Sequence, residues 1–446
     1  MSKWKLSGSK TINKKEKGLR MKLAKIASAL LVGGLISTGA NATNGYFASG
    51  YGIQSQGMGG VSIAFPQDSL AAASNPASIG FLGDRLDIGV TYFQPNRTAT
   101  LSGTNNQYGM RGWSDGSFNG NGTSSFWIPE FGVTKEINKQ FSVGLNVYGN
   151  GGMNTSYTSR IPLFNAGTAM GSPNNSTPGV NLEQMFISPT ISWKPVESQS
   201  LAASLIYVNQ TFSASGLQNF MQPGYSTSPN NLTNNGNSTS TGFGVQLGWL
   251  GKITDNLSLG IRYQPKISMS NFNSYSGLFA GGGSFDIPET YGAGIAYKPT
   301  KDITLAADYQ AIKYGNIPAI ANSMLNQTQL GSANGPGFGW QNVNVYKLGA
   351  NWRVNSDWAL RIGYNFNNQP IPNNQVLFNV LAPGVITQQA SIGATYYIGK
   401  QYEISGFYAR GFSQTVTGAI PAAYGGGTSS ISMYQDSFGL AFGWKY

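Results

Sequence analysis

The sequence predicts an all-β protein, a 14-stranded antiparallel transmembrane β-barrel with an N-terminal plug inside the lumen. Three observations predict this fold. Apolar and polar residues alternate over strand-length segments, short and long polar connections follow one another in turn, and the chain ends on an aromatic strand. The composition agrees, because 10% of the 446 residues are charged while the chain holds 60 glycines and 23 each of Tyr and Phe.

Alternation is clearest at the C-terminus. Phe438, Leu440, Phe442, Trp444 and Tyr446 share one face of an extended strand, and small or polar residues occupy the other face. The same period occurs at 185–193, 243–249, 257–263 and 358–366. The terminal aromatic residue resembles the signal that the barrel-assembly machinery recognises, although Phe is the more usual last residue. A soluble β-sandwich shows the same period, so alternation alone leaves that alternative open.

The spacing of the connections favours the barrel. Short polar turns are expected near 138–139, 197–198, 254–256, 300–302, 355–357 and 399–400. Long polar stretches are expected near 104–124, 152–182, 215–240, 273–284, 315–341, 367–387 and 414–430. Strands are expected to begin near Asp84, Ser125, Gln140, Glu183, Gln199, Thr241, Asn256, Phe285, Asp302, Val343, Ser356, Gln388, Gln401 and Ile431. Fourteen strands with short turns at one end and long loops at the other are typical of a closed outer-membrane barrel.

Residues 1–42 have the three regions of a secretory signal peptide. Nine Lys or Arg precede an apolar run from Ile26 to Ile36, and Ala40-Asn41-Ala42 forms a small-residue cleavage site. We expect cleavage after Ala42. Met21 stands directly before the core of this signal and is an alternative start. The run is too short for a membrane anchor, the other interpretation. Export together with a barrel predicts the outer membrane of a Gram-negative bacterium.

The charge and the residue inventory exclude several classes of protein. Removing the leader takes 28 basic residues to 19 and 17 acidic residues to 16, so the net charge falls from +11 to +3. No clustered basic face remains for nucleic acid. The chain has no His and no Cys, which excludes a Ser-His-Asp triad, a thiol nucleophile and the usual zinc sites. The acids are scattered, so we expect no enzyme, metal or cofactor.

Residues 43–83 precede the first predicted strand and lack strand alternation. They are small, polar and rich in glycine. A barrel of fourteen tilted strands, residues 84–446, encloses a lumen wider than its own side chains fill. We therefore expect residues 43–83 to form a plug, or hatch, inside the lumen, and the alternative is a disordered periplasmic tail.

Motifs in this segment resemble those of a known family. Gly59 and Gly60, then Asp68, then the triplet Asn75-Pro76-Ala77 are similar to the hatch of the FadL family of outer-membrane transporters for long-chain fatty acids and aromatic hydrocarbons. The resemblance covers the whole mature chain and continues at 128–130, 287–289 and 367–372. Residues 379–385 resemble a loop of the hydrocarbon-type branch. A His often follows that loop, and Gln389 is the nearby residue here.

The resemblance implies a passive, monomeric channel for hydrophobic small molecules, surrounded by outer-membrane lipid and lipopolysaccharide. Ligand is captured at external loops, passes a hatch and leaves sideways through the barrel wall. In the family an inward kink of the third strand opens this exit, and here the third strand ends in Gly149, Asn150, Gly151 and Gly152. The simpler interpretation is that these glycines begin the following loop. A general porin and a surface adhesin are the alternative functions.

Two further groups of residues are candidate ligand contacts. The external loops carry more apolar side chains than solvated loops need, and these side chains are candidates for a capture groove: Met153, Tyr157, Ile161, Leu163, Phe164, Met170, Leu217, Phe220, Met221 and Tyr225. By alternation, Arg262, Arg353 and Arg361 face the lumen, where a carboxylate-headed ligand would favour a cation. Each is also interpretable as an ordinary polar lumen residue.

Overall fold

The computed structural model describes residues 44–106, 110–166 and 175–446. The expected signal peptide, Thr43 and Met170 lie outside these ranges. None of the helices in the described part of the chain is long and apolar enough to span a lipid bilayer.

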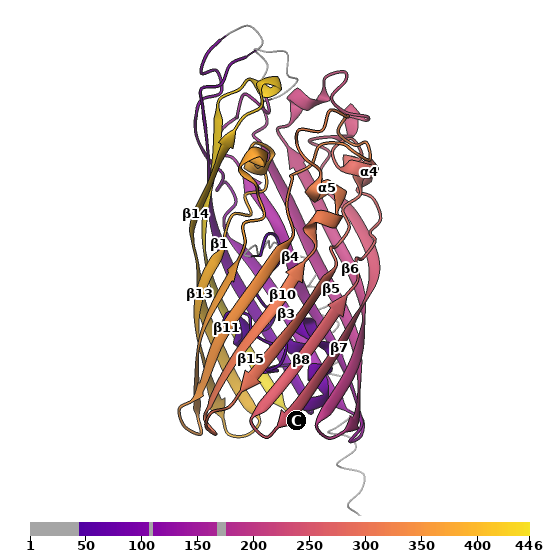
Figure 1. Ribbon diagram of the computed structural model, residues 1–446, viewed down its shortest axis with the longest axis vertical. Helices are drawn as coiled ribbons and strands as arrows, with labels where there is room; N and C mark the ends of the chain where they lie inside the picture. The colour runs from indigo at the N-terminus through magenta and orange to yellow at the C-terminus, as the bar shows by residue number, and fades with distance from the viewer. Residues whose placement is uncertain (1–43, 107–109, 167–174) are drawn as a thin grey trace, which may run out of the picture. The chain divides into compact units, whose positions relative to one another are not determined.

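The described residues form a closed antiparallel β-barrel (Figure 1). Each long strand pairs with its neighbours along the chain, and β1 closes the sheet by pairing with β15 from Arg85↔Lys445 to Ser102↔Thr428. The fourteen wall strands are β1 (Arg85–Ser102), β3 (Phe126–Glu136), β4 (Phe141–Ser156), β5 (Gly179–Val196), β6 (Gln199–Ser215), β7 (Ser238–Thr254), β8 (Leu257–Gln264), β9 (Thr290–Tyr297), β10 (Ile303–Ile312), β11 (Val343–Arg353), β12 (Trp358–Asn367), β13 (Gln388–Ile398), β14 (Tyr402–Ala419) and β15 (Thr428–Lys445). A short strand, β2 (Gly116–Asn119), pairs with the upper end of β1.

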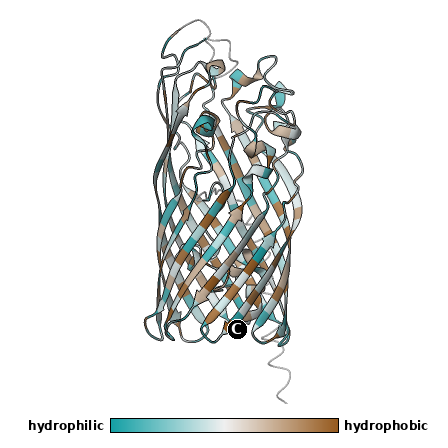
Figure 2. Cartoon of the chain, viewed as in Figure 1, coloured by the Kyte–Doolittle hydropathy of each residue, from teal (hydrophilic) through white to brown (hydrophobic). Residues whose placement is uncertain are grey.

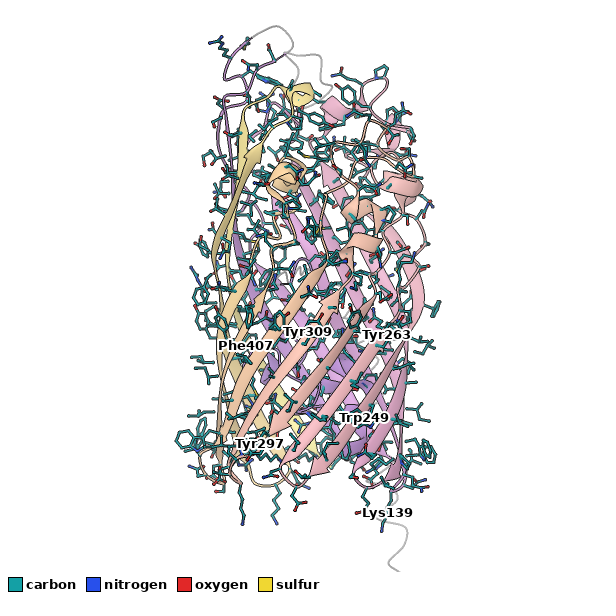
Figure 3. The ribbon with its side chains drawn as sticks, viewed as in Figure 1. Lys139, Trp249, Tyr263, Tyr297, Tyr309 and Phe407 are labelled. Atoms are coloured by element: carbon teal, nitrogen blue, oxygen red, sulfur yellow. The ribbon has the colours of Figure 1, made fainter. Side chains whose placement is uncertain are left out.

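Alternation along the strands places apolar side chains on the outer wall, as the sequence predicts. Phe243 is 68% exposed and Leu440 is 65% exposed, which in water would be unfavourable but in a bilayer is the normal state of a lipid-facing residue. Figure 2 shows the resulting brown bands across the strands. Trp249 and Tyr297 lie near the short turns, whereas Tyr263 and Tyr309 lie further along the wall (Figure 3). These residues belong to the two aromatic belts expected where the wall meets the membrane surfaces.

Several strands extend beyond the predicted limits. The last loop is expected at 414–430, yet β14 runs to Ala419 and β15 begins at Thr428. Here the hydroxyls of Thr415 and Thr417 bond those of Ser432 and Ser430 at 2.6 and 2.7 Å. Likewise β4 runs to Ser156 and β5 begins at Gly179, where a loop is expected at 152–182. The less buried positions of these extensions carry polar residues such as Asn154, Asn181 and Thr415, so the extensions lack the apolar outer face that reveals the wall.

One predicted strand begins later than expected. The chain from Phe285 to Glu289 is outside β9, and Ile287 forms an isolated bridge with Ile267 instead. Pro288 has no amide hydrogen for a ladder, which accounts for the late start at Thr290.

The N-terminal segment, residues 44–83, lies against the inner face of the barrel and appears in indigo behind the front strands (Figure 1). It contains α2 (Ile53–Gln56), α3 (Ala71–Ser74) and the 3-10 helix η1 (Pro76–Phe81). The long connections carry the remaining short helices: η3 (Gln218–Met221), η4 (Pro229–Asn231), η5 (Asn273–Tyr275), α4 (Ala280–Gly283), η6 (Tyr314–Asn316), α5 (Pro318–Ala321), η7 (Asn373–Gln375), η8 (Phe378–Val380) and η9 (Ala422–Tyr424).

Candidate functional site

The Asn75-Pro76-Ala77 triplet fastens the N-terminal segment to the wall. The Asn75 side-chain oxygen accepts a hydrogen bond from the Ala77 amide at 3.1 Å and caps η1, in which Pro76 occupies a first-turn position. Its side-chain nitrogen donates to the carbonyls of Ile63 at 2.8 Å and Trp249 at 3.0 Å. One buried amide therefore joins η1, the chain before α3 and strand β7.

Glycines on both sides permit close contact between the segment and the wall. Gly59 and Gly60 have φ of +72° and +81°, a region that favours glycine. The Gly59 amide donates to Ser391 at 2.8 Å. On the wall, a Cβ at Gly363 would lie 2.0 Å from the Gly59 nitrogen, and one at Gly248 would lie 2.1 Å from the Asn75 side-chain oxygen. At Gly363 the backbone of the segment therefore lies directly on the wall, and at Gly248 the Asn75 side chain does so.

Three wall carboxylates accept hydrogen bonds from backbone amides of the segment. Glu130 on β3 accepts from Gly52 at 3.1 Å. Asp308 on β10 accepts from Ser62 at 2.7 Å and Ile63 at 2.9 Å. Asp87 on β1 accepts from the Ser69 amide at 2.8 Å and from its hydroxyl at 2.6 Å. These hydrogen bonds hold the segment at three places around the lumen.

Asp68 belongs to the segment and lies among buried charges of the wall. Arg85 pairs with Asp87 at 2.7 Å and with Glu403. Burial, together with the negative charges of Asp87 and Glu403, raises the pKa of the Asp68 carboxyl to about 7, although Arg85 and Arg361 act in the opposite direction. Asp68 therefore lies in the cluster as a carboxyl that gains a proton near neutral pH.

Of the three predicted lumen cations, two contact the N-terminal segment. Arg262 donates to the Ser74 carbonyl at 3.5 Å and to Thr290 at 2.8 Å. Arg361 donates to the side chains of Gln67 at 2.6 Å and Gln54 at 2.5 Å.

Arg353 differs from these two. It lies at the turn between β11 and β12, where it donates to the carbonyls of Asn355 at 3.0 Å and Ser356 at 2.6 Å. The structure therefore brings Arg262 and Arg361 together with the segment and leaves Arg353 at the turn. Lys347, which the sequence argument does not single out, donates to the Gly60 carbonyl at 3.3 Å.

The ladder between β3 and β4 is incomplete. It runs from Glu136↔Ser142 to Phe131↔Val147 and stops there, although both strands continue. Beyond this point the upper part of β3 pairs with β1, and the upper part of β4 pairs with β5. Pro129 lies on the open edge of β3 and has no amide hydrogen to donate. The pairing of β4 with β5 shifts register between Gly149 and Gly151, which marks a bulge.

The predicted break at Gly149, Asn150, Gly151 and Gly152 is thus a change of partner rather than the end of a strand. These residues stay within β4, which corrects the expectation that the strand dissolves there. The N-terminal segment supplies the missing partner. Tyr46 accepts from the Gly152 amide at 2.9 Å, the Ala48 amide donates to Asn150 at 3.0 Å, and Phe47 bridges Gly151. Residues 46–48 therefore pair with the edge of β4 at residues 150–152.

The predicted capture residues divide into two groups. Phe164 and Phe220 pack with ring centroids 5.9 Å apart and, with Leu217, line a small apolar cavity of about 40 Å³ among the loops. Leu163 and Ile161 are buried in the same apolar cluster, and Met221 packs against it. Tyr225 is 44% exposed, and the centroid of its ring lies 6.3 Å from that of Phe220.

Met153 and Tyr157 belong to the same buried apolar cluster but do not line this cavity. Met153 belongs to β4 instead of a loop and borders a second cavity of about 20 Å³. Tyr157 is buried and donates to the Val380 carbonyl at 2.7 Å.

Other residues of this cluster were not predicted as contacts. Phe378 and Leu381, from the connection between β12 and β13, line the first cavity with Phe338. Trp340 packs against Tyr314 and Tyr46 of the N-terminal segment. In the sequence, the apolar run from Val376 to Val385 indicates that this connection is buried, because a solvated loop does not need so many apolar residues.

A closed barrel with a lipid-facing outer wall, a buried N-terminal segment and apolar long loops defines a class, the outer-membrane transport barrels. Residues 36–429 match the family model described as outer membrane protein transport protein (OMPP1/FadL/TodX). The chain belongs to this family, whose members are transporters and channels for hydrophobic compounds in the outer membrane of Gram-negative bacteria. The comparison with curated proteins finds no match.

Solved structures share the fold. A Pseudomonas aeruginosa FadL homologue superposes with a TM-score of 0.67 at 18% identity, covering 90% of this chain and 99% of that one. The Ralstonia pickettii toluene transporter TbuX gives 0.62 at 17% identity, and the P. putida toluene transporter TodX gives 0.62 at 16%. Each covers 89% of this chain and 99% of its own. At these identities the likeness concerns the fold alone.

Proposed function

We propose that this protein is a passive channel for the uptake of hydrophobic small molecules, either long-chain fatty acids or aromatic hydrocarbons. Ligand is captured among the apolar loops, moves past the N-terminal segment, which acts as a hatch, and leaves sideways between β3 and β4. Outer-membrane lipid and lipopolysaccharide surround the wall of the barrel. The protein works as a monomer, and its aromatic C-terminal strand addresses it to the barrel-assembly machinery.

The incomplete ladder between β3 and β4 carries this proposal. An unpaired stretch of strand edge persists in a membrane protein only where protein, water or ligand satisfies it, and residues 46–48 do so for β4 at residues 150–152. Below this level the lumen is occupied by buried charges such as Arg85, Asp87 and Glu403, a poor environment for an apolar solute. The sideways route avoids that layer and leads the ligand into lipid.

Uptake by cells that lack their own such channel tests the proposal. Cells producing the protein should accumulate labelled oleate or toluene faster than cells with an empty vector, while uptake of a labelled hydrophilic sugar stays unchanged. Faster sugar uptake would instead indicate a general porin. No increase for either apolar solute, with the protein folded in the outer membrane, would contradict the proposal.

A further inference from the structure

Arg410 is a cation on the lipid-facing side of the barrel wall. The alternation of burial along β14 places it on the outer face, as it does Tyr408 and Phe412. Away from the short turns, it is the one Lys or Arg that the described wall strands carry on this face. Charged side chains are unfavourable against hydrocarbon, so such a residue lies at the membrane interface or serves a function.

Neighbours on β14 and β15 hold the Arg410 side chain in place. Its guanidinium donates to Asp436, which also accepts from the Tyr408 hydroxyl at 2.8 Å. The Arg410 Cζ lies 4.3 Å from the centroid of the Tyr434 ring. The guanidinium makes no other hydrogen bond to a described residue, and the side chain is 37% exposed. Because a guanidinium has five N–H donors, several remain for an oxygen acceptor outside the protein.

Toward the short turns, Arg410 borders a groove in the lipid-facing wall. The groove crosses the strands from β9 to β14, and the outward residues Ala307, Ala350 and Ala390 are small there. It reaches from Tyr297, near the short turns (Figure 3), to Arg410 and has a volume of about 860 Å³ with an almost wholly apolar lining. Within the membrane such a groove accepts acyl chains, which leaves the head group of the same lipid at the level of Arg410.

Toward the loops, the outer face of the same strands changes from apolar to hydroxyl-bearing side chains. The strand β14, in gold, continues upward there (Figure 1). Three exposed pairs of hydroxyls join across the strands: Thr415 with Ser432 at 2.6 Å, Thr417 with Ser430 at 2.7 Å, and Ser102 with Thr428 at 2.7 Å. Hydroxyls both donate and accept hydrogen bonds, which suits them to sugars.

We propose that this part of the outer wall binds lipopolysaccharide, the phosphorylated glycolipid of the outer leaflet. Its acyl chains lie in the groove, a phosphate accepts hydrogen bonds from Arg410, and its sugars lie along the hydroxyl pairs of β14 and β15. The three zones of the wall follow one another in the same order as the three parts of this lipid. Because the site faces away from the lumen, it is separate from the uptake route.

Lipopolysaccharides that differ only in phosphate test the proposal. The purified protein in detergent should bind a lipopolysaccharide with core sugars and phosphates at least about ten-fold more tightly than the same lipid without its phosphates, the effect of hydrogen bonds between charged groups. Arg410→Gln should remove this difference. Arg410→Lys should retain part of it, because Lys keeps the charge and lacks the planar fork.

Lys135→Gln is the matched control for Arg410→Gln. Lys135 also lies on the outer face, pairs with a carboxylate, Asp84, and has its ammonium 5.4 Å from the centroid of the Tyr446 ring, but it lies at the short-turn end. Its replacement should change the affinity for lipopolysaccharide by less than about two-fold.

A second variant tests the contact with sugars. Thr417→Val combined with Ser430→Ala removes one pair of exposed hydroxyls from the wall. This variant should bind lipopolysaccharide with core sugars about two- to ten-fold more weakly. Its affinity for lipid A, which lacks the core sugars, should stay unchanged. Equal weakening for both lipids would remove the sugars from the proposal.

Three outcomes would overturn the site. The first is equal affinity of the wild-type protein for the phosphorylated and dephosphorylated lipids, which counts whether or not the variants fold. The second is a folded Arg410→Gln variant, checked by circular dichroism, that keeps the full difference. The third is binding of phosphatidylglycerol as tight as that of lipopolysaccharide, which would indicate a surface for any anionic lipid.

Discussion

Asn75 joins three parts of the molecule through one side chain. It caps η1, bonds the Ile63 carbonyl and bonds the Trp249 carbonyl of β7. Because the site is buried, no water replaces these bonds when the amide is removed. Leaving a buried carbonyl without a donor lowers stability by more free energy than an average hydrogen bond adds.

Asn75→Ala should lower the free energy of releasing the N-terminal segment by about 1–3 kcal/mol. Faster proteolysis within 52–83, with unchanged thermal unfolding of the barrel, is the expected result. Asn138→Ala is the control, since Asn138 accepts from the amides of Gln140 and Phe141 in an exposed turn. Unchanged proteolysis of the segment would contradict the role given to Asn75.

Asp68 makes the seating of the segment depend on pH. Its pKa is raised from 3.8 to about 7 when the segment is in place. Between these two pKa values the carboxyl is protonated in the seated segment and ionised in the released one. The free energy that this proton contributes to seating therefore declines as pH rises from about 4 to about 7. Above pH 7 the charged carboxylate stays buried at a constant cost.

Asp68→Asn should remove this decline. Relative to the wild type, the variant segment should be better protected from amide hydrogen exchange at pH 8 than at pH 5, after correction for the intrinsic rate. Asp255→Asn, in the exposed turn between β7 and β8, should leave the wild-type dependence unchanged. If protection changes equally between pH 5 and pH 8 in the wild type and in Asp68→Asn, Asp68 does not titrate in this range.

The contacts of single side chains are the part of the site that the sequence predicts least well. Asn75-Pro76-Ala77 stands out as a motif, but its bond to Trp249 joins positions 174 residues apart and needs the fold. Glu130 and Asp308 look like isolated acids, because their partners are backbone amides that carry no sequence signal. The alternation places Arg353 on the lumen face, but Arg353 is the last residue of β11 and donates instead to carbonyls of the adjoining turn.

Strands are predictable where lipid requires one apolar face. All fourteen wall strands follow from alternation and turns, and β6, β11 and β13 begin at the expected residues Gln199, Val343 and Gln388. Prediction fails where the strands leave the apolar band, as with the paired hydroxyls of Thr417 and Ser430. It also fails at β4, since a run of glycines looks the same whether it ends a strand or changes its partner.

The two ends of the barrel should differ in accessibility. Cysteines introduced one at a time in the loops 157–166 or 313–342 should react with a membrane-impermeant maleimide on intact cells. Cysteines at Asp255 or Ser356, in short turns that face the periplasm in barrels of this kind, should react only after the outer membrane is opened. The chain has no native cysteine, so the background is clean. Labelling of the short turns on intact cells would invert the topology.

The whole molecule combines an apolar upper interior with a polar, charged layer around the N-terminal segment. The wall is interrupted between β3 and β4, where residues 46–48 pair with β4 in place of β3. Gly149 lies at this interruption, and a Cβ there would be 3.0 Å from the Ile128 side chain of β3. A Cβ at Gly151 would instead meet the Tyr46 carbonyl at 1.9 Å. A change at Gly149 therefore tests the gap, whereas one at Gly151 displaces the segment.

The most direct test of sideways exit is a reversible lock across the gap. A disulfide between cysteines at Ile128 and Gly149 would join β3 to β4 above their last pair, and one between cysteines at Val133 and Leu145 would join the same strands where they are already paired. Uptake of labelled oleate or toluene should fall to the empty-vector level when the upper pair is oxidised and recover on reduction, while the lower pair has no effect. Undiminished uptake by the folded, oxidised Ile128–Gly149 variant would contradict sideways exit at this position.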